Sequence, residues 1–140
     1  MIRVVIDTNV LVSALLTSGG LPEAVVDLAI SGEVQWFASE AVLAEYEHVL
    51  KRPRLLIDSG QAAGAMARIR AIVSVVTPTM RVTAASDPDD NHFLECAETA
   101  RAQYLVTGNI RHFPEVWKDT RIVTPRQFID AWTTAPEESL

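Results

Sequence analysis

The sequence predicts an α/β fold, specifically a three-layer α/β/α sandwich with a central parallel sheet of four or five strands. Short apolar segments rich in β-branched residues alternate with longer segments of helical periodicity, the pattern of a parallel sheet covered by helices. The first segment, residues 2–6, is continuously apolar after Arg3, which is typical of a buried parallel strand. With 49% apolar residues, a chain of 140 residues can bury a core within one domain.

The first half of the chain is expected to hold two strands and four helices. In order they are a strand at 2–6, helices from about Val10 and over 21–31, a strand at 34–38, and helices over 39–50 and 59–72. The break Ser18-Gly19-Gly20 separates the first two helices. Ser39 is a plausible N-cap for the third helix, and Arg52-Pro53 ends it.

The second half is expected to complete the sheet. Residues 73–77 form a short strand, and Asp87-Pro88 opens a helix to about Arg101, with proline at its first position. Strands follow at 103–107 and 121–124, and Pro125 begins a last helix through Trp132. We therefore expect a single domain over 1–134 and a C-terminal tail over 135–140.

Composition narrows the class of protein. No apolar run approaches the roughly 20 residues of a membrane span. The chain starts as a strand rather than as a signal peptide, and the single cysteine, Cys96, excludes an internal disulfide. These features predict a cytoplasmic protein without a membrane partner.

The net charge of −6 speaks against a nucleic-acid partner, because phosphate binding usually leaves a basic surface. Arginine, however, dominates the 12 basic residues. Several gather in the middle third of the chain: Arg52, Arg54, Arg68, Arg70 and Arg81. They fit either an acidic site beside an arginine-rich surface or an ordinary mixed-charge surface, and composition alone favours the ordinary surface.

Asp7 directly follows the first strand and precedes a helix. In a parallel α/β sheet, sites lie outside the carboxyl ends of the strands, where the strand order reverses. The position therefore suits a metal ligand or a helix N-cap equally. One carboxylate, with two oxygens, can serve both roles.

Asp90 lies in the segment that opens the helix from Asp87. The apolar residues Phe93, Leu94 and Ala97 follow it at i+3, i+4 and i+7, so Asp90 points along the buried stripe, unlike Asp87 and Asp89. A buried carboxylate needs a partner. A bound cation is favoured over backbone N–H groups at the helix start.

Glu45 is less clearly placed by pattern. Its helix is apolar at 42, 43, 46, 49 and 50, with Glu45 on one edge of this stripe and Glu47 on the other. Glu40 is a third candidate. Periodicity does not choose among them, and each also fits a solvated helix face.

Asn109 follows Gly108 just past the strand at 103–107. Its amide oxygen suits a hard cation but brings no charge, and a turn residue is the simpler interpretation. The histidines, His48, His92 and His112, show no metal-ligand spacing. His112 is the one most expected to approach the site, although a structural or surface role is favoured.

Four motifs together resemble the PIN-domain family, specifically the bacterial PIN toxins of type II toxin–antitoxin modules. The motifs are Val4-Val5-Ile6-Asp7-Thr8-Asn9-Val10, residues 39–46 with Glu45, residues 87–97 with Asp90, and Tyr104-Leu105-Val106-Thr107-Gly108-Asn109. The resemblance covers about residues 2–131 and selects Glu45 over Glu40 and Glu47. Many relatives have aspartate in place of Asn109.

The resemblance implies a metal-dependent ribonuclease that hydrolyses RNA phosphodiesters with Mg²⁺ or Mn²⁺, as one or two ions. It implies Asp7, Glu45 and Asp90 as catalytic metal ligands. Asn109, Thr8 and Thr107 would support them, and Arg111, Arg52 and Arg54 would contact the RNA backbone. A small antitoxin and a second copy of the chain are the expected partners.

A different class of function stays open at this point. Because Asn109 removes one negative charge, the chain could be a PIN-like module that binds RNA or protein with little or no catalysis. Receiver and haloacid-dehalogenase-like folds fit less well. The receiver's adjacent acid pair is missing, and Asp7-Thr8-Asn9 is not Asp-x-Asp.

Overall fold

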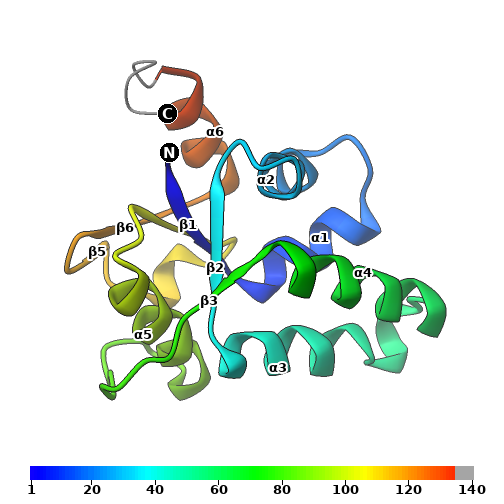
Figure 1. The fold of residues 1–140 in the computed structure, drawn as a ribbon, viewed down its shortest axis with the longest axis horizontal. Coiled ribbons are helices and arrows are strands. Elements are labelled where there is room, and N and C mark those ends of the chain that lie inside the picture. Colours follow the sequence, from blue (N-terminus) through cyan, green and yellow to red (C-terminus); the bar gives the residue numbers. More distant parts are fainter. Residues whose placement is uncertain (135–140) are drawn as a thin grey trace.

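The computed structural model describes residues 1–134, in which a six-stranded sheet is flanked by helices (Figure 1). The strands are β1 (Arg3–Ile6), β2 (Gln35–Ala38), β3 (Ser74–Val75), β4 (Tyr104–Val106), β5 (Val116–Trp117) and β6 (Thr120–Val123). Their order is β3-β2-β1-β4-β6-β5. The predicted tail at 135–140 lies outside the described residues.

The predicted parallel sheet is confirmed. The pairs β3–β2, β2–β1, β1–β4 and β4–β6 are all parallel. The strand β5, which pairs antiparallel with β6, was not predicted. It has two residues, and Lys118 makes the tight turn to β6 with a φ of 54°. A segment this short shows no strand periodicity.

The six helices lie close to the predicted ranges. They are α1 (Thr8–Leu16), α2 (Leu21–Ile30), α3 (Glu40–Leu50), α4 (Ser59–Ile72), α5 (Asn91–Ala100) and α6 (Pro125–Thr134). Ser39 caps α3 as predicted, since its side chain accepts a hydrogen bond from Val42 N at 3.2 Å. Three short 3₁₀ turns were not predicted: η1 (Pro53–Leu55), η2 (Pro88–Asp90) and η3 (Ile110–His112).

Helices cover both faces of the sheet. Tyr104 in β4 packs edge-on against Phe128 in α6, with 5.5 Å between the ring centroids. Val4 in β1 is in register with Tyr104, so its neighbour Arg3 points to the opposite face, where it hydrogen-bonds to Ala100 in α5. The helices α5 and α6 therefore lie in different layers, which confirms the three-layer sandwich.

The chain order places a crevice beside β1. From the central β1 the chain first builds outward to β2 and β3, and then crosses to β4 and β6 on the other side. The order thus reverses between β1 and β4, and ligands bind at such a point in open α/β sheets. Asp7 and Thr107 are the first residues after these two strands.

Among residues 1–134, no single helix is long and apolar enough to cross a membrane. The consecutive pair α1 and α2 reaches the required length and composition, but the two helices are bent by 105°. Val10, Leu11 and Val25 of this pair belong to the buried core, which accounts for its apolar character.

Candidate active site

An open cleft of about 460 Å³ lies at the carboxyl ends of β1 and β4 and gathers most of the predicted site residues. These are Asp7, Thr8, Glu45, Arg52, Arg54, Asp90 and Asn109. They come from five separate segments of the chain, so the fold brings together residues up to 102 positions apart (109 − 7).

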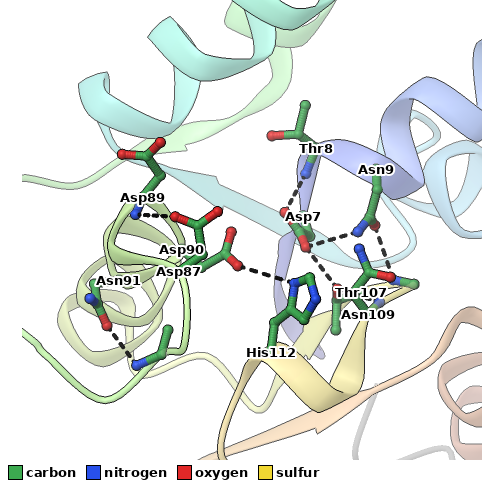
Figure 2. Close-up of polar contacts among 12 residues, drawn as sticks. Asp7, Thr8, Asn9, Asp87, Asp89, Asp90, Asn91, Thr107, Asn109 and His112 are labelled. Carbon is green, nitrogen blue, oxygen red and sulfur yellow. Dashed lines mark hydrogen bonds and ion pairs between the residues drawn. The ribbon is translucent and has the colours of Figure 1, made fainter.

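Asp7 is 5% exposed and ends β1 while capping α1 (Figure 2). Its carboxylate accepts hydrogen bonds from Thr8 N and from Thr107 Oγ1, both at 2.7 Å, and from Asn9 Nδ2 at 3.2 Å. Burial raises the pKa of Asp7 to about 6, and the nearby Glu45 carboxylate adds to this rise against the hydrogen-bond donors. The hydrogen bonds thus fix the position of the carboxylate, while burial and the Glu45 charge disfavour its ionised form.

Glu45 is the glutamate of α3 that reaches the cleft with Asp7. Its carboxylate accepts a hydrogen bond from the Thr8 hydroxyl. Glu40, with a side chain 73% exposed, pairs with Arg70, and Glu47 pairs with Lys51, and neither lines the cleft. The structure therefore separates three glutamates that periodicity left equivalent.

Asp90 occupies the N-cap position of α5 without a side-chain capping hydrogen bond, and its side chain is 16% exposed. Phe93 and Leu94 are fully buried, so the predicted helical phase is correct. Burial raises the pKa of Asp90 to about 6, and the charges of Asp7, Asp87 and Glu45 raise it further. Unlike Asp7, it contacts a histidine, His112, with 3.7 Å between Oδ2 and Nδ1 (Figure 2).

Asp87 and Asp89 also line the cleft, which was not predicted, and so does His112, the histidine most expected to approach the site. Both side chains are exposed, so the expectation that Asp87 and Asp89 lie off the buried stripe is confirmed. The helical pattern did not place them at the cleft, because the segment forms the 3₁₀ turn η2 before α5 begins. A 3₁₀ turn has about three residues per turn instead of 3.6, so the side chains point elsewhere. His112 reaches the cleft through η3, and no sequence pattern marked that turn.

Asn109 lines the cleft, and Gly108 precedes it just after β4. Asn109 N donates to Thr107 Oγ1 at 3.0 Å, and Gly108 N donates to Asn9 Oδ1 at 3.0 Å. A Cβ on Gly108 would lie 3.4 Å from Asn9 Oδ1. This is an ordinary van der Waals distance and the φ of Gly108 is not left-handed, so the backbone here does not require glycine.

Arg111 is the predicted residue that lies elsewhere. It lines a separate hollow with Tyr104, Arg121 and Gln127 instead of the cleft. Arg52 and Arg54, which flank Pro53 after α3, are both exposed and do line the cleft.

The donor set suits a divalent cation in chemical type. Carboxylates and an amide oxygen are the ligands preferred by Mg²⁺ and Mn²⁺, and the raised pKa values of Asp7 and Asp90 reflect burial and repulsion that a cation relieves. Within residues 1–134, no three Asp, Glu, His or Cys side chains are arranged closely enough to hold one ion. Metal binding thus requires these side chains to turn toward one another.

A family model for the PIN domain matches residues 3–111, most of the described chain. The chain belongs to the PIN-domain family. A relative from Methanocaldococcus jannaschii, the uncharacterized protein MJ1680, is 26% identical over 141 residues, which span 92% of this chain and 90% of the relative. The family match agrees with the resemblance of the four sequence motifs.

Solved structures share the fold of this PIN domain. A chain of VapBC2 from Rickettsia felis, bound to promoter DNA, superposes with a TM-score of 0.59 at 14% identity, covering 88% of this chain and 98% of that chain. A chain of FitAB bound to a DNA fragment gives 0.56 at 13% identity, covering 87% and 94%. VapC20 of Mycobacterium tuberculosis, a toxin that cleaves the sarcin-ricin loop, gives 0.51 at 21% identity, covering 81% and 98%.

Proposed function

We propose that this PIN domain is a ribonuclease that depends on Mg²⁺ or Mn²⁺ and hydrolyses RNA phosphodiester bonds. The observation that carries the proposal is the convergence of Asp7, Glu45 and Asp90 in one cleft at the point where the strand order reverses. In a buried acidic site of this kind, bound cations offset the charge repulsion.

Asp7, Asp90 and Glu45 are the proposed cation ligands, for one or two ions. When bound, a divalent cation activates a water molecule and stabilises the negative charge that develops on the phosphate. Thr107 and Thr8 keep the Asp7 carboxylate oriented through their hydrogen bonds, and Asn109 supplies a neutral oxygen at the rim.

Arg52 and Arg54 are proposed to contact the RNA backbone, because guanidinium groups bind phosphate oxygens in a fixed geometry. They line the cleft with the acidic residues, so they can hold the strand whose phosphate lies at the carboxylates. Arg111 lines a different hollow, and a contact from it would require the RNA to extend beyond the cleft.

The proposed biological role is that of a toxin from a type II toxin–antitoxin module. VapBC2 and FitAB, whose chains share this fold, are described as complexes bound to DNA, and VapC20 is described as a toxin. The partners proposed for this chain are a small antitoxin and a second copy of itself. Its net charge of −6 suits a basic antitoxin.

A module that binds RNA or protein without cleaving RNA is the second candidate. It is favoured by the neutral Asn109 at the cleft rim and by the lack, among residues 1–134, of three ligands already arranged around one point. Titration with Mn²⁺ separates the two candidates. The nuclease requires cation binding below millimolar concentration, with or without RNA.

The deciding experiment incubates the protein with a labelled pool of random-sequence RNA in Mg²⁺, Mn²⁺ or EDTA. We expect cleavage with either metal and none in EDTA. We expect Asp7→Asn to reduce cleavage by about 10²- to 10⁴-fold, because the metal supplies several kcal/mol of transition-state stabilisation. Asp27→Asn, at an exposed position on α2, is the matched control and should cleave normally. Full activity in Asp7→Asn, or no cleavage by the wild type under any condition, contradicts the proposal.

A further inference from the structure

The cleft extends beyond its acidic residues along α1 and α3. The hydrogen bond from Thr8 to Glu45 joins these two helices at the acidic end. Val12 follows Thr8 in α1 by four residues, and Val49 follows Glu45 in α3 by four residues. Both valines line the cleft. Because residues i and i+4 share a helix face, the two valines lie on the same helix faces as Thr8 and Glu45, about 6 Å further along the helix axes.

The turn η1 continues this surface. Leu55 at the end of η1 lines the cleft, together with Arg52 and Arg54. The next residue, Leu56, adopts a left-handed backbone with φ of 56°, is 90% exposed, and does not line the cleft. The chain thus directs one of two consecutive leucines to the cleft and the other to solvent.

The arginines of the cleft are not paired with its carboxylates. Among the residues that the structure describes, neither Arg52 nor Arg54 has a carboxylate within 4.0 Å, although Asp7, Glu45 and Asp90 line the same cleft. The cleft therefore has an acidic end, an apolar strip of Val12, Val49 and Leu55, and an arginine end. A ligand that fills it presents an anion to the arginines and an apolar face to the strip.

We propose that the apolar strip is a nucleobase subsite, in which Leu55, Val12 and Val49 seat the base of the nucleotide next to the scissile phosphate. Arg52 and Arg54 hold the phosphate beyond that base. The inference rests on the proposed function, which supplies RNA as the ligand. A nucleic-acid strand alternates anionic phosphates with flat, largely apolar base faces, which matches the order of surfaces in the cleft. An acidic peptide suits the strip and the arginines but has no group for the acidic end.

The test measures binding of a fluorescent, unpaired 12-nucleotide RNA by anisotropy, in Ca²⁺ with RNA integrity checked on a gel, and again in EDTA. We expect Leu55→Ala to weaken binding about fivefold to tenfold, the usual effect of losing one base contact. Leu56→Ala, the adjacent solvent-exposed leucine, should leave the affinity unchanged. Val12→Ser, on a different element, should reproduce the loss, which excludes a distortion of η1 as its cause.

A set of RNAs with one abasic nucleotide at each position identifies the base that is bound. At one position the missing base should weaken binding to the wild type but not to Leu55→Ala, because the two changes remove the same contact. Arg52→Ala and Arg54→Ala should each reduce the slope of log affinity against log salt by about 0.7. Arg68→Ala, at an exposed position on α4, should leave that slope unchanged.

Equal affinities for Leu55→Ala and Leu56→Ala, or additive effects at every abasic position, would overturn the subsite even if the protein cleaves RNA. Binding of a poly-glutamate peptide that Leu55→Ala weakens would overturn the assignment to nucleic acid. If the wild type cleaves no RNA in Mg²⁺ or Mn²⁺ but shows the coupling between Leu55 and one base, the nuclease proposal fails and the subsite stands.

Discussion

The acidic cleft has two halves that hold their carboxylates differently. Asp7 sits at the end of β1, is 5% exposed and accepts hydrogen bonds from Thr8, Asn9 and Thr107. Asp90 sits where η2 meets α5, and its contact with His112 is 3.7 Å, longer than a hydrogen bond.

Both halves raise the pKa of their carboxylate to about 6, but for partly different reasons. Burial is the largest cause in each. At Asp7, hydrogen-bond donors oppose the effect of burial, whereas at Asp90 three neighbouring carboxylates reinforce it. The Asp7 carboxylate is thus positioned by hydrogen bonds from its neighbours, whereas the Asp90 carboxylate has no such donors among residues 1–134 and faces His112 at 3.7 Å.

The largest expected effect comes from lengthening the Asp7 carboxylate. Asp7→Glu should lower Mn²⁺ affinity and RNA cleavage by about 10³-fold. The longer side chain keeps the charge but moves it from its position beside the cation, which costs about 4 kcal/mol. Asp90→Glu should stay within about tenfold of the wild type, because its less constrained surroundings admit a longer side chain. Calorimetric Mn²⁺ titration and the cleavage assay measure both. Equal losses in the two variants would remove the distinction between the halves.

The hydrogen bond that orients the Asp7 carboxylate can be tested separately from the charge of that carboxylate. Thr107→Val removes the 2.7 Å hydrogen bond to the carboxylate and should reduce cation affinity or cleavage by about 10- to 100-fold. Thr120 is also buried, and its hydroxyl donates to the Ala102 carbonyl, outside the cleft. Thr120→Val should therefore destabilise the fold without changing the cation affinity of the folded protein. A Thr107→Val protein with unchanged cation affinity would show that the hydrogen bond does not organise Asp7.

The sequence predicted the Asp7 half better than the Asp90 half, and the reason is physical. A strand end and a helix phase are periodic features, so the placement of Asp7 and the inward face of Asp90 followed from pattern. The positions of Asp87, Asp89 and His112 depend on 3₁₀ turns, which have no long-range periodicity.

Two further residues show what pattern alone leaves open. Glu45 lies at the edge of an apolar stripe, and periodicity did not choose between it and Glu47. The family resemblance selected Glu45, and the structure adds its tertiary hydrogen bond from Thr8. Arg111 is two residues from Asn109 in sequence, yet η3 directs it to another hollow. Sequence proximity therefore does not predict which side chains meet after a turn.

The pH dependence of stability without metal distinguishes the halves by the size of the effect. Because the folded protein raises the pKa of Asp7 from 3.8 to about 6, the stability from this group is complete below pH 3.8 and is lost as pH rises through 6. The shift corresponds to at most about 3 kcal/mol. Asp7→Asn should therefore raise the free energy of unfolding at pH 8 by about 2 kcal/mol, after about 1 kcal/mol for weakened hydrogen bonding.

Below pH 4 the gain from Asp7→Asn should vanish, because the wild-type carboxyl is then protonated. Asp90→Asn should give the same sign with a smaller gain, since part of the rise in its pKa comes from Asp7, Asp87 and Glu45 and is shared with them. Urea unfolding in EDTA at pH 4 and pH 8 measures each difference. A loss of stability in Asp7→Asn at pH 8 would show that hydrogen bonding outweighs burial at this carboxylate.

The smallest expected effect concerns the rim residue Asn109, which lines the cleft with a neutral side chain. Asn109→Asp adds a negative charge beside carboxylates whose pKa values are already raised, so the metal-free protein should lose stability at pH 8. With Mn²⁺ the same charge should strengthen binding of a second ion by severalfold, because an exposed charge at the rim is largely screened by solvent. Calorimetric titration should then show a second Mn²⁺ in the variant at concentrations where the wild type binds one. If the variant and the wild type bind the same number of ions with the same affinity, the charge at position 109 does not set the number of metals, and the two carboxylate halves alone determine it.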